Sequence, residues 1–280
     1  MNKKIAAKKL LSALALSCLA GFSLTAQAHR MWILPYETVA AGESTWITFD
    51  VAVSNDIFQI DHAGPRVDGI TVLTPDGKAE EPKNLVAGQL RSSFDVNLTA
   101  QGTYKVAIVS GGLNARWETA DGKRGSWPAR GAKANPAEFA TAVPKDAKNV
   151  EVSQNSRRVE TFVTLGAPTQ QALQPTNQGL ELLPITHPND LRIDEPSQFK
   201  FLIDGKPAAG VKVTIIPGGS RYRNSAQELE IESDSQGIIR IQWQGPGQYW
   251  LGASYKDDKA QKPAKNRVGS YSATFEVLPL

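Results

Sequence analysis

The chain has 280 residues, which is enough for about two ordinary domains. Hydrophobic residues make up 41% and charged residues 21%, and this composition excludes a largely disordered chain. The formal net charge of +3 comes from the first 28 residues, which contain four lysines and no acid. Removing these four from the 31 basic residues leaves 27 against 28 acidic ones, so the charge balance disfavours nucleic-acid binding.

Residues 1–28 have the features of a signal peptide. A lysine-rich start is followed by an apolar stretch over 10–24, and Ala26 and Ala28 form an A-x-A cleavage site. The apolar stretch is shorter than the roughly 20 residues of a membrane-spanning helix. We therefore expect cleavage after Ala28 and a periplasmic mature protein that does not span the membrane. Cleavage after Ala26 is the alternative.

The only cysteine, Cys18, lies within this apolar stretch. The preceding Leu16 and Ser17 leave a lipoprotein cleavage site as an alternative, whereas Ala15 at position −3 favours an apolar filler of the signal peptide. In either case the mature chain contains no disulfide. Its stability must come from its core, for which about 250 residues are sufficient.

The remainder of the chain shows short alternating segments separated by turns, which is typical of β-strands. Turn residues recur at 74–77, 204–207 and 234–237. The predicted strands lie at 45–53, 69–73, 93–98, 103–109 and 158–165 in the first half, and at 199–203, 211–216, 229–232, 238–243, 249–253 and 271–277 in the second. Because no long helical periodicity interrupts them, we predict an all-β protein of two tandem antiparallel, immunoglobulin-like β-sandwiches.

The predicted domains are 29–166 and 180–280, joined by a polar, proline-punctuated linker at 167–179. An insertion near 113–150 contains loop signals and a short helix with Asn135 as its N-cap. Insertions of this length are more often functional than ordinary hairpin loops, and we expect this one at one end of the first sandwich.

The first histidine stands at a chemically special position. Cleavage after Ala28 makes His29 the first residue, whose α-amine and Nδ1 can close a six-membered chelate around one metal ion. A second imidazole would complete a T-shaped three-nitrogen site for Cu(II) or Ni(II). Cleavage after Ala26 would place His29 third and give a square-planar four-nitrogen site for the same metals.

His62 is the first candidate for the second imidazole, because it follows the predicted strand 45–53 in a loop with Asp56 and Asp61. These carboxylates could ligate the ion or orient the imidazole. His187, on a segment held extended by two prolines, is a further candidate ligand, for which a hydrogen-bonded structural role is favoured. The predicted metal-site residues are thus His29, His62, Asp61, Asp56 and His187. No known catalytic motif is present, and no enzyme activity is predicted.

Three motifs carry a family resemblance: residues 28–35 (Ala-His-Arg-Met-Trp-Ile-Leu-Pro), Ser54-Asn55-Asp56 with Asp61-His62, and 181–184 with His187-Pro188. They resemble an uncharacterised family of exported bacterial proteins often labelled the periplasmic component of an ABC-type cobalt/nickel transport system. That family is related to the substrate-specific component of nickel-uptake systems, whose N-terminal segment carries the metal-binding histidine. The second half is similar to carboxypeptidase-regulatory and transthyretin-like sandwiches.

The resemblance covers essentially the whole mature chain and implies a periplasmic protein that binds nickel, cobalt or copper and delivers it to a membrane metal transporter. Two other functions remain open. One is a metal-free interaction module that recognises a surface protein or glycan through exposed Trp32, Trp117 and Trp127. The other is a redox enzyme, because copper oxygenases also hold their metal with an N-terminal histidine and a second histidine on a β-sandwich.

Overall fold

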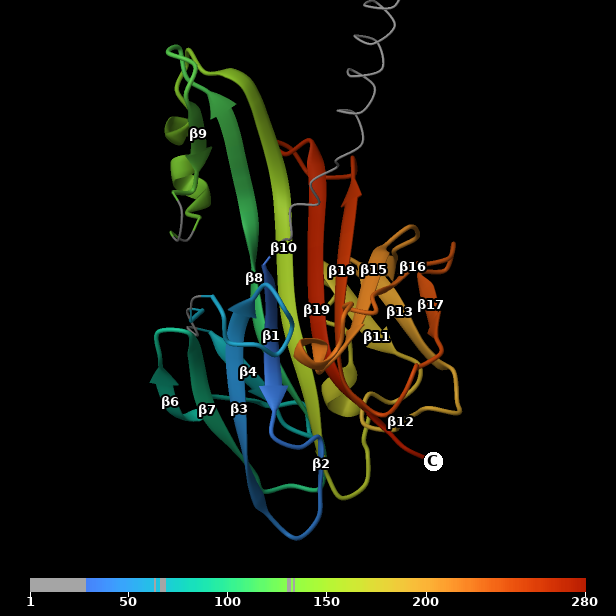
Figure 1. Cartoon of the computed structure of the whole chain (residues 1–280). Coiled ribbons are helices and arrows are strands. Elements are labelled where there is room, and N and C mark those ends of the chain that lie inside the picture. Colours follow the sequence, from blue (N-terminus) through green and yellow to red (C-terminus); the bar gives the residue numbers. More distant parts are fainter. Residues whose placement is uncertain (1–28, 63, 66–68, 130–131, 133) are drawn as a thin grey trace, which may run out of the picture.

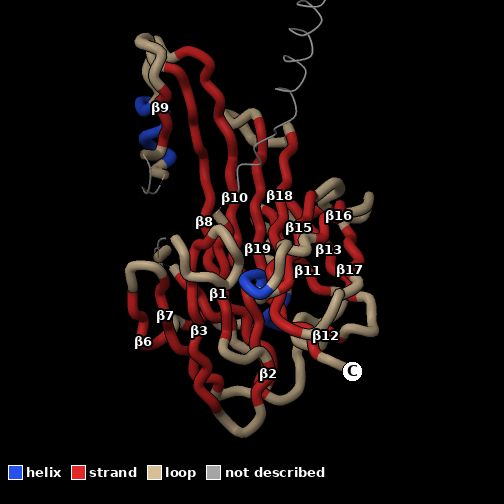
Figure 2. Tube along the Cα trace, in the orientation of Figure 1, coloured by secondary structure: helices blue, strands red, loops and turns tan. Residues whose placement is uncertain are grey.

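The computed structural model describes residues 29–280 except 63, 66–68, 130–131 and 133. The two predicted cleavage sites and Cys18 lie outside the described residues. Strands dominate the described part, and its helical segments are all short (Figure 2). These segments are η2 (Pro136–Glu138), α2 (Phe139–Ala142), η3 (Gln171–Leu173) and η4 (Ser220–Tyr222). The prediction of an all-β sandwich fold is confirmed.

The strands of the described residues form three sheets (Figure 1). A four-stranded sheet has the order β1 (Arg30–Pro35), β3 (Thr45–Ser54), β7 (Arg91–Leu98), β6 (Lys83–Ala87). Eight strands of an eleven-stranded sheet follow the order β16 (Leu229–Glu232), β15 (Lys212–Pro217), β18 (Gly247–Asp257), β19 (Asn266–Leu278), β10 (Lys148–Leu165), β8 (Gly102–Glu118), β4 (Ile70–Leu73), β5 (Ala79–Glu80). Its other three strands, β12 (Leu191–Arg192), β2 (Val39–Ala40) and β9 (Arg124–Trp127), pair with β19, β10 and β8 respectively. The third sheet contains β11 (Leu180–Pro184), β13 (Ser197–Ile203), β14 (Lys206–Pro207) and β17 (Ile238–Ile241).

The large sheet belongs to both predicted sandwiches. Strand β10 from the first half pairs in parallel with β19 from the second, from Ser153↔Asn266 to Thr161↔Thr274. Because successive side chains of a strand point to opposite faces, β10 contributes to two different cores. Val159 and Val163 join the core under the four-stranded sheet, whereas Phe162 joins the core under the third sheet. The two small sheets therefore cover opposite faces of one large sheet.

The predicted linker and insertion are both parts of this framework. Within 167–179, η3 buries Ala172 and Leu173, and Leu173 packs in the core of the second half. In the insertion, β8 and β10 continue as a long two-stranded ribbon that projects from the body together with β9 (Figure 1). The predicted short helix is present as η2 and α2, where Asn135 Oδ1 accepts a hydrogen bond from Ala137 N at 3.2 Å.

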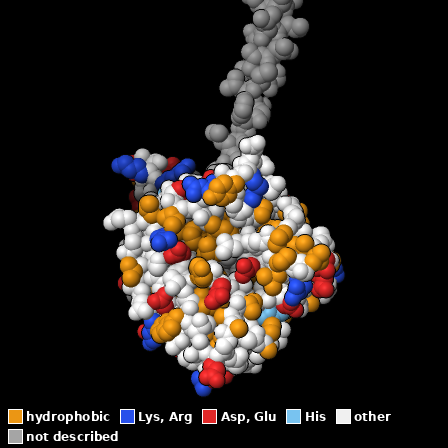
Figure 3. Space-filling view, turned by 60° about the horizontal axis from the view of Figure 1, so that its bottom comes forward, with side chains coloured by type: hydrophobic (Ala, Val, Ile, Leu, Met, Phe, Trp, Pro, Cys, Tyr) orange, Lys and Arg blue, Asp and Glu red, His pale blue; other side chains and the backbone are white. Residues whose placement is uncertain are grey.

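The turns predicted from the sequence form as expected. Gly77 N donates a hydrogen bond to Thr74 O at 2.8 Å, and Gly237 N donates to Asp234 O at 2.9 Å. Both glycines have positive φ angles, 81° and 77°, which a residue with a side chain rarely adopts. On the face shown in Figure 3, acidic and basic side chains are interspersed, in keeping with their near-equal numbers beyond residue 28.

Candidate functional site

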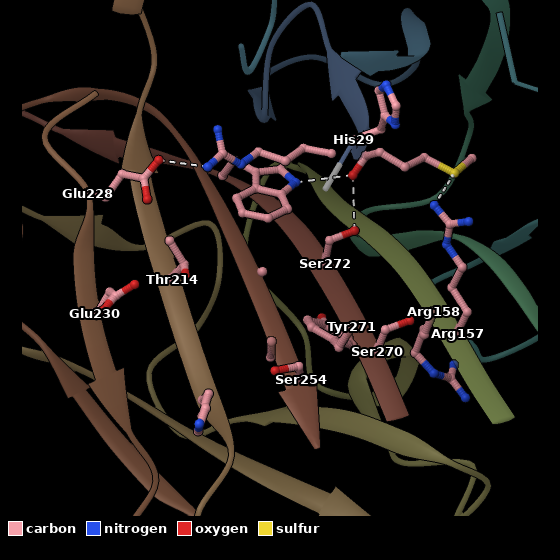
Figure 4. A pocket seen from close by; sticks show the side chains of 16 residues that line it. His29, Arg157, Arg158, Thr214, Glu228, Glu230, Ser254, Ser270, Tyr271 and Ser272 are labelled. Atoms are coloured by element: carbon pink, nitrogen blue, oxygen red, sulfur yellow. Dashed lines mark hydrogen bonds and ion pairs between the residues drawn. The ribbon is translucent and has the colours of Figure 1, made fainter. Parts of the chain in front are cut away.

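The N-terminal end of β1 is tied to strands of the second half. Arg30 forms an ion pair with Glu228 (Nη2 to Oε1, 2.6 Å), and its guanidinium lies 5.8 Å from the ring centroid of Trp250. The Met31 carbonyl accepts hydrogen bonds from Trp250 Nε1 at 3.1 Å and Ser272 Oγ at 3.0 Å. These contacts hold Arg30 and Met31 in place and thereby position the backbone of the preceding His29 (Figure 4).

The structure brings His29 and His62 together. Their ring centroids are 3.9 Å apart and the rings are stacked with an interplanar angle of 24°. The strand pairing explains this, because Arg30 lies opposite Ser54 and residue 29 is therefore next to the loop that follows β3. Both side chains are exposed, so neither ring is held by surrounding packing. Two of the predicted metal ligands thus meet at the start of β1.

Asp61 helps to close the loop that carries His62. Its Oδ1 accepts a hydrogen bond from Asn55 N at 3.0 Å, which returns the loop to the end of β3. Asp56 lies in the same loop, where its carbonyl accepts a hydrogen bond from Gln59 N at 3.2 Å. Among the described residues, no three His, Cys, Asp or Glu side chains are grouped so that they could hold a metal ion. The two carboxylates therefore do not complete a ligand set with the two imidazoles.

His187 lies at the other end of β10. Its Nε2 is within hydrogen-bonding distance of Thr103 Oγ1 (3.0 Å) and Thr169 O (3.2 Å), and its Nδ1 accepts a hydrogen bond from Asn189 N (3.1 Å). Burial lowers the pKa of this imidazole and favours its neutral form. Both nitrogens are engaged within the fold, which is the hydrogen-bonded arrangement that the sequence favoured.

The separation of His187 from the histidine pair follows from β10. Arg157 of this strand contacts Met31, two residues from His29, whereas Thr164 hydrogen-bonds to the Thr103 hydroxyl that faces His187. Seven residues of extended strand span roughly 23 Å. The structure therefore does not bring His187 to the same site.

A cavity of about 740 Å³ adjoins the histidine pair. It lies on the face of the large sheet that points away from the third sheet, and β1 forms one of its walls (Figure 4). Small residues of β18, β19 and β15, most of them with a hydroxyl group, form its floor: Ser254, Ser270, Ser272, Gly252 and Thr214. Its volume is in the usual range for small-molecule sites.

The cavity contains charged side chains of both signs. Glu228 is paired with Arg30, and Glu230 lies on the same wall. Arg157 and Lys212 also line the cavity, and in the part of the chain that the structure describes neither forms an ion pair. The nearest acceptor to the Arg157 guanidinium is Met31 Sδ at 3.3 Å, a weak one. Although Arg157 is exposed to the cavity, the surrounding protein excludes part of its water, and this desolvation lowers its pKa.

A buried polar network lies beneath this floor, and sequence reasoning missed it. Arg158 is 5% exposed and forms ion pairs with Glu160 and Glu181, both at 3.1 Å. Tyr271 Oη donates a hydrogen bond to Glu160 Oε2 at 2.8 Å, and Thr176 donates to Glu181 from its amide and its hydroxyl. Burial and the adjacent Glu160 raise the pKa of Tyr271 well above its ordinary value, so the phenol remains a donor. The available signal was an oppositely charged pair, Arg158 and Glu160, at alternate positions of the predicted strand 158–165.

The expectation that Trp32, Trp117 and Trp127 are exposed is wrong for two of them. Trp32 is 2% exposed and packs with Trp250 and neighbouring apolar residues, and its Nε1 donates a hydrogen bond to Ser54 Oγ at 2.8 Å. Trp127 is 8% exposed and packs edge-on against Phe139. Trp117 is half-buried. An apolar body with one hydrogen-bonding group suits the buried position of Trp32, whereas Trp127 and Trp117 pack in a small apolar cluster of the projecting ribbon.

The chain belongs to the family described as Domain of unknown function (DUF4198), whose model matches residues 26–257. The predicted membership of an uncharacterised family is therefore confirmed. No curated protein matches the chain. Within the described ranges, no helix has the length and apolar character needed to cross a membrane.

Among solved structures, the chain aligns with the D1-D4 ectodomain fragment of ICAM-5, at 11% identity and a TM-score of 0.20. The alignment covers 89% of this chain and 51% of that one, so the chain spans about half the length of that fragment. At this TM-score the likeness supports no conclusion about fold or function.

Proposed function

We propose that this protein binds one divalent transition-metal ion (nickel, cobalt or copper) through His29 and His62 in the periplasm, and delivers it to a membrane metal transporter. The observation that supports the proposal is the 3.9 Å separation of the two imidazole rings, which belong to residues 33 positions apart in the sequence. Neither histidine is engaged in packing that would explain the pairing, because both are exposed.

The donor set suits these metals if cleavage follows Ala28. His29 then supplies its α-amine and Nδ1, and His62 supplies the third nitrogen of a T-shaped site. Stacked rings do not direct their nitrogens at a common point, so metal binding requires one or both exposed rings to turn about their side-chain bonds. The ion pair between Arg30 and Glu228 would hold the backbone of β1 in place while they do so.

The test is a calorimetric titration of metal-free protein, produced by export so that its first residue can be verified by intact mass. We expect one Ni(II), Co(II) or Cu(II) per chain. His62→Ala should weaken binding at least 10- to 100-fold, since that range already follows the loss of a residue that only supports a ligand. One additional residue before His29 should have a similar effect, because it removes the α-amine from the chelate.

His187→Gln is the matched control and should leave the metal affinity unchanged, because His187 lies at the other end of β10. The proposal fails if the wild-type protein binds no metal stoichiometrically, or if His62→Ala binds as tightly as the wild type. Proton competition for the imidazole nitrogens also predicts that affinity falls on acidification and that binding releases protons.

A further inference from the structure

A transverse row of four polar residues crosses the floor of the cavity. The strand registers pair Arg157 with Ser270, Ser270 with Ser254, and Ser254 with Lys212, on the adjacent strands β10, β19, β18 and β15. Directly paired residues share one face of a sheet, and all four line the cavity. All four are exposed to it. Within the cavity the row thus has two cations with two hydroxyl groups between them, and beyond Lys212 the register continues to Glu232 of β16, which does not line the cavity.

We propose that this row binds a small organic polycarboxylate, a function that goes beyond the metal site and does not require it. Neighbouring strands are about 4.8 Å apart, so the backbones of Arg157 and Lys212 are separated by roughly 14 Å. A molecule with two or more carboxylates can place one beside each cation without either long side chain bending across the row, and it can also accept hydrogen bonds from the serines.

The charges around the row favour this ligand. Arg157 has a thioether as its nearest acceptor, and a guanidinium is suited to bidentate contact with a carboxylate. Of the two acids that line the cavity, Glu228 is neutralised by Arg30. The other, Glu230, lies opposite Thr214 in the next row of the register. Glu230 and Glu232 both belong to β16, beyond Lys212, so the Arg157 end of the row is the end farther from negative charge.

The experiment titrates citrate, as the probe, into protein made metal-free with a chelating resin. We expect one citrate per chain. Arg157→Gln should weaken binding by roughly 10- to 100-fold, the range for loss of a charge-assisted hydrogen-bonding partner. Ser254→Glu should abolish binding, because it places a negative charge in the centre of the row. Both positions are exposed, so the variants should fold.

Arg116→Gln is the matched control: Arg116 is an exposed arginine on the projecting ribbon, and citrate affinity should not change. His62→Ala should also keep its citrate affinity, which separates this test from that of the metal site. The inference is overturned if citrate does not bind the wild type at millimolar concentration, or if both row variants bind it like the wild type. Phosphate binding as tightly as citrate, with the same dependence on Arg157, would overturn the assignment to a polycarboxylate.

Discussion

Two consecutive arginines of β10 show how one strand serves two purposes. Arg158 points to the buried face of the large sheet, where Glu160 and Glu181 neutralise it. Arg157 points to the opposite face and lines the open cavity without a carboxylate partner. Their neighbours across the sheet differ in the same way, since Tyr271 is 2% exposed and Ser270 is exposed.

The two arginines differ in role: the charge of Arg158 stabilises the fold, whereas the charge of Arg157 is accessible to a ligand. A charge that is removed from water must be paired and hydrogen-bonded, or it destabilises the fold by several kcal/mol. The Arg158 network meets this requirement and connects β10 of the first half with β11 and β19 of the second. Arg157 remains partly hydrated and needs no internal partner, so it is free to bind a ligand.

Replacing each arginine by leucine provides the strongest test of this distinction. Arg158→Leu leaves Glu160 and Glu181 buried without their cation, and we expect the free energy of unfolding to fall by about 3–5 kcal/mol. Arg157→Leu should change it by no more than about 0.5 kcal/mol. Urea denaturation of both variants measures the two values. Equal losses would contradict the assignment of separate roles.

A smaller effect is expected within the buried network alone. Tyr271→Phe removes the hydroxyl that donates to Glu160 Oε2, and the oxygen is left buried without that donor. We expect a loss of about 1–3 kcal/mol in the free energy of unfolding. Tyr222→Phe is the control, because Tyr222 is 84% exposed and its replacement should have little effect. If both variants are as stable as the wild type, the network contributes packing rather than hydrogen bonding.

His187 extends the comparison to a half-buried base without a carboxylate hydrogen bond. Its folded-state pKa is lowered by burial, whereas an unfolded histidine titrates near 6.5. As pH falls below 6.5, the unfolded chain therefore takes up a proton before the folded chain does, and the stability that is present above this pH is lost.

We expect the wild type to lose stability more steeply than His187→Gln between pH 7 and pH 5. At pH 7.5, the variant should be less stable by about 0.5–1.5 kcal/mol because it loses a hydrogen bond. Urea-unfolding curves recorded over this pH range give both quantities. Parallel pH profiles for the two proteins would show that His187 does not carry the effect.

Most strands and turns could be predicted because their signals are local. Alternation and turn residues located β3, β7 and β13, and the observed strands extend the predicted segments by only a few residues. The extension of β8 and β10 into a ribbon could not be predicted in this way, because segments 102–118 and 148–165 stabilise each other by pairing. Nothing within either segment specifies its partner.

The candidate site likewise has features that the local sequence predicts and features that only strand pairing sets. The sequence by itself predicted a special position for His29, through the cleavage motif before it, and placed His62 in a loop with two carboxylates. Only the tertiary structure decided that these imidazoles meet, that His187 lies elsewhere, and that Arg157 faces a cavity while Arg158 is buried. The physical reason is that local residue pattern sets strand alternation, whereas the pairing of β1 with β3 and of β10 with β19 sets which faces and loop ends come together.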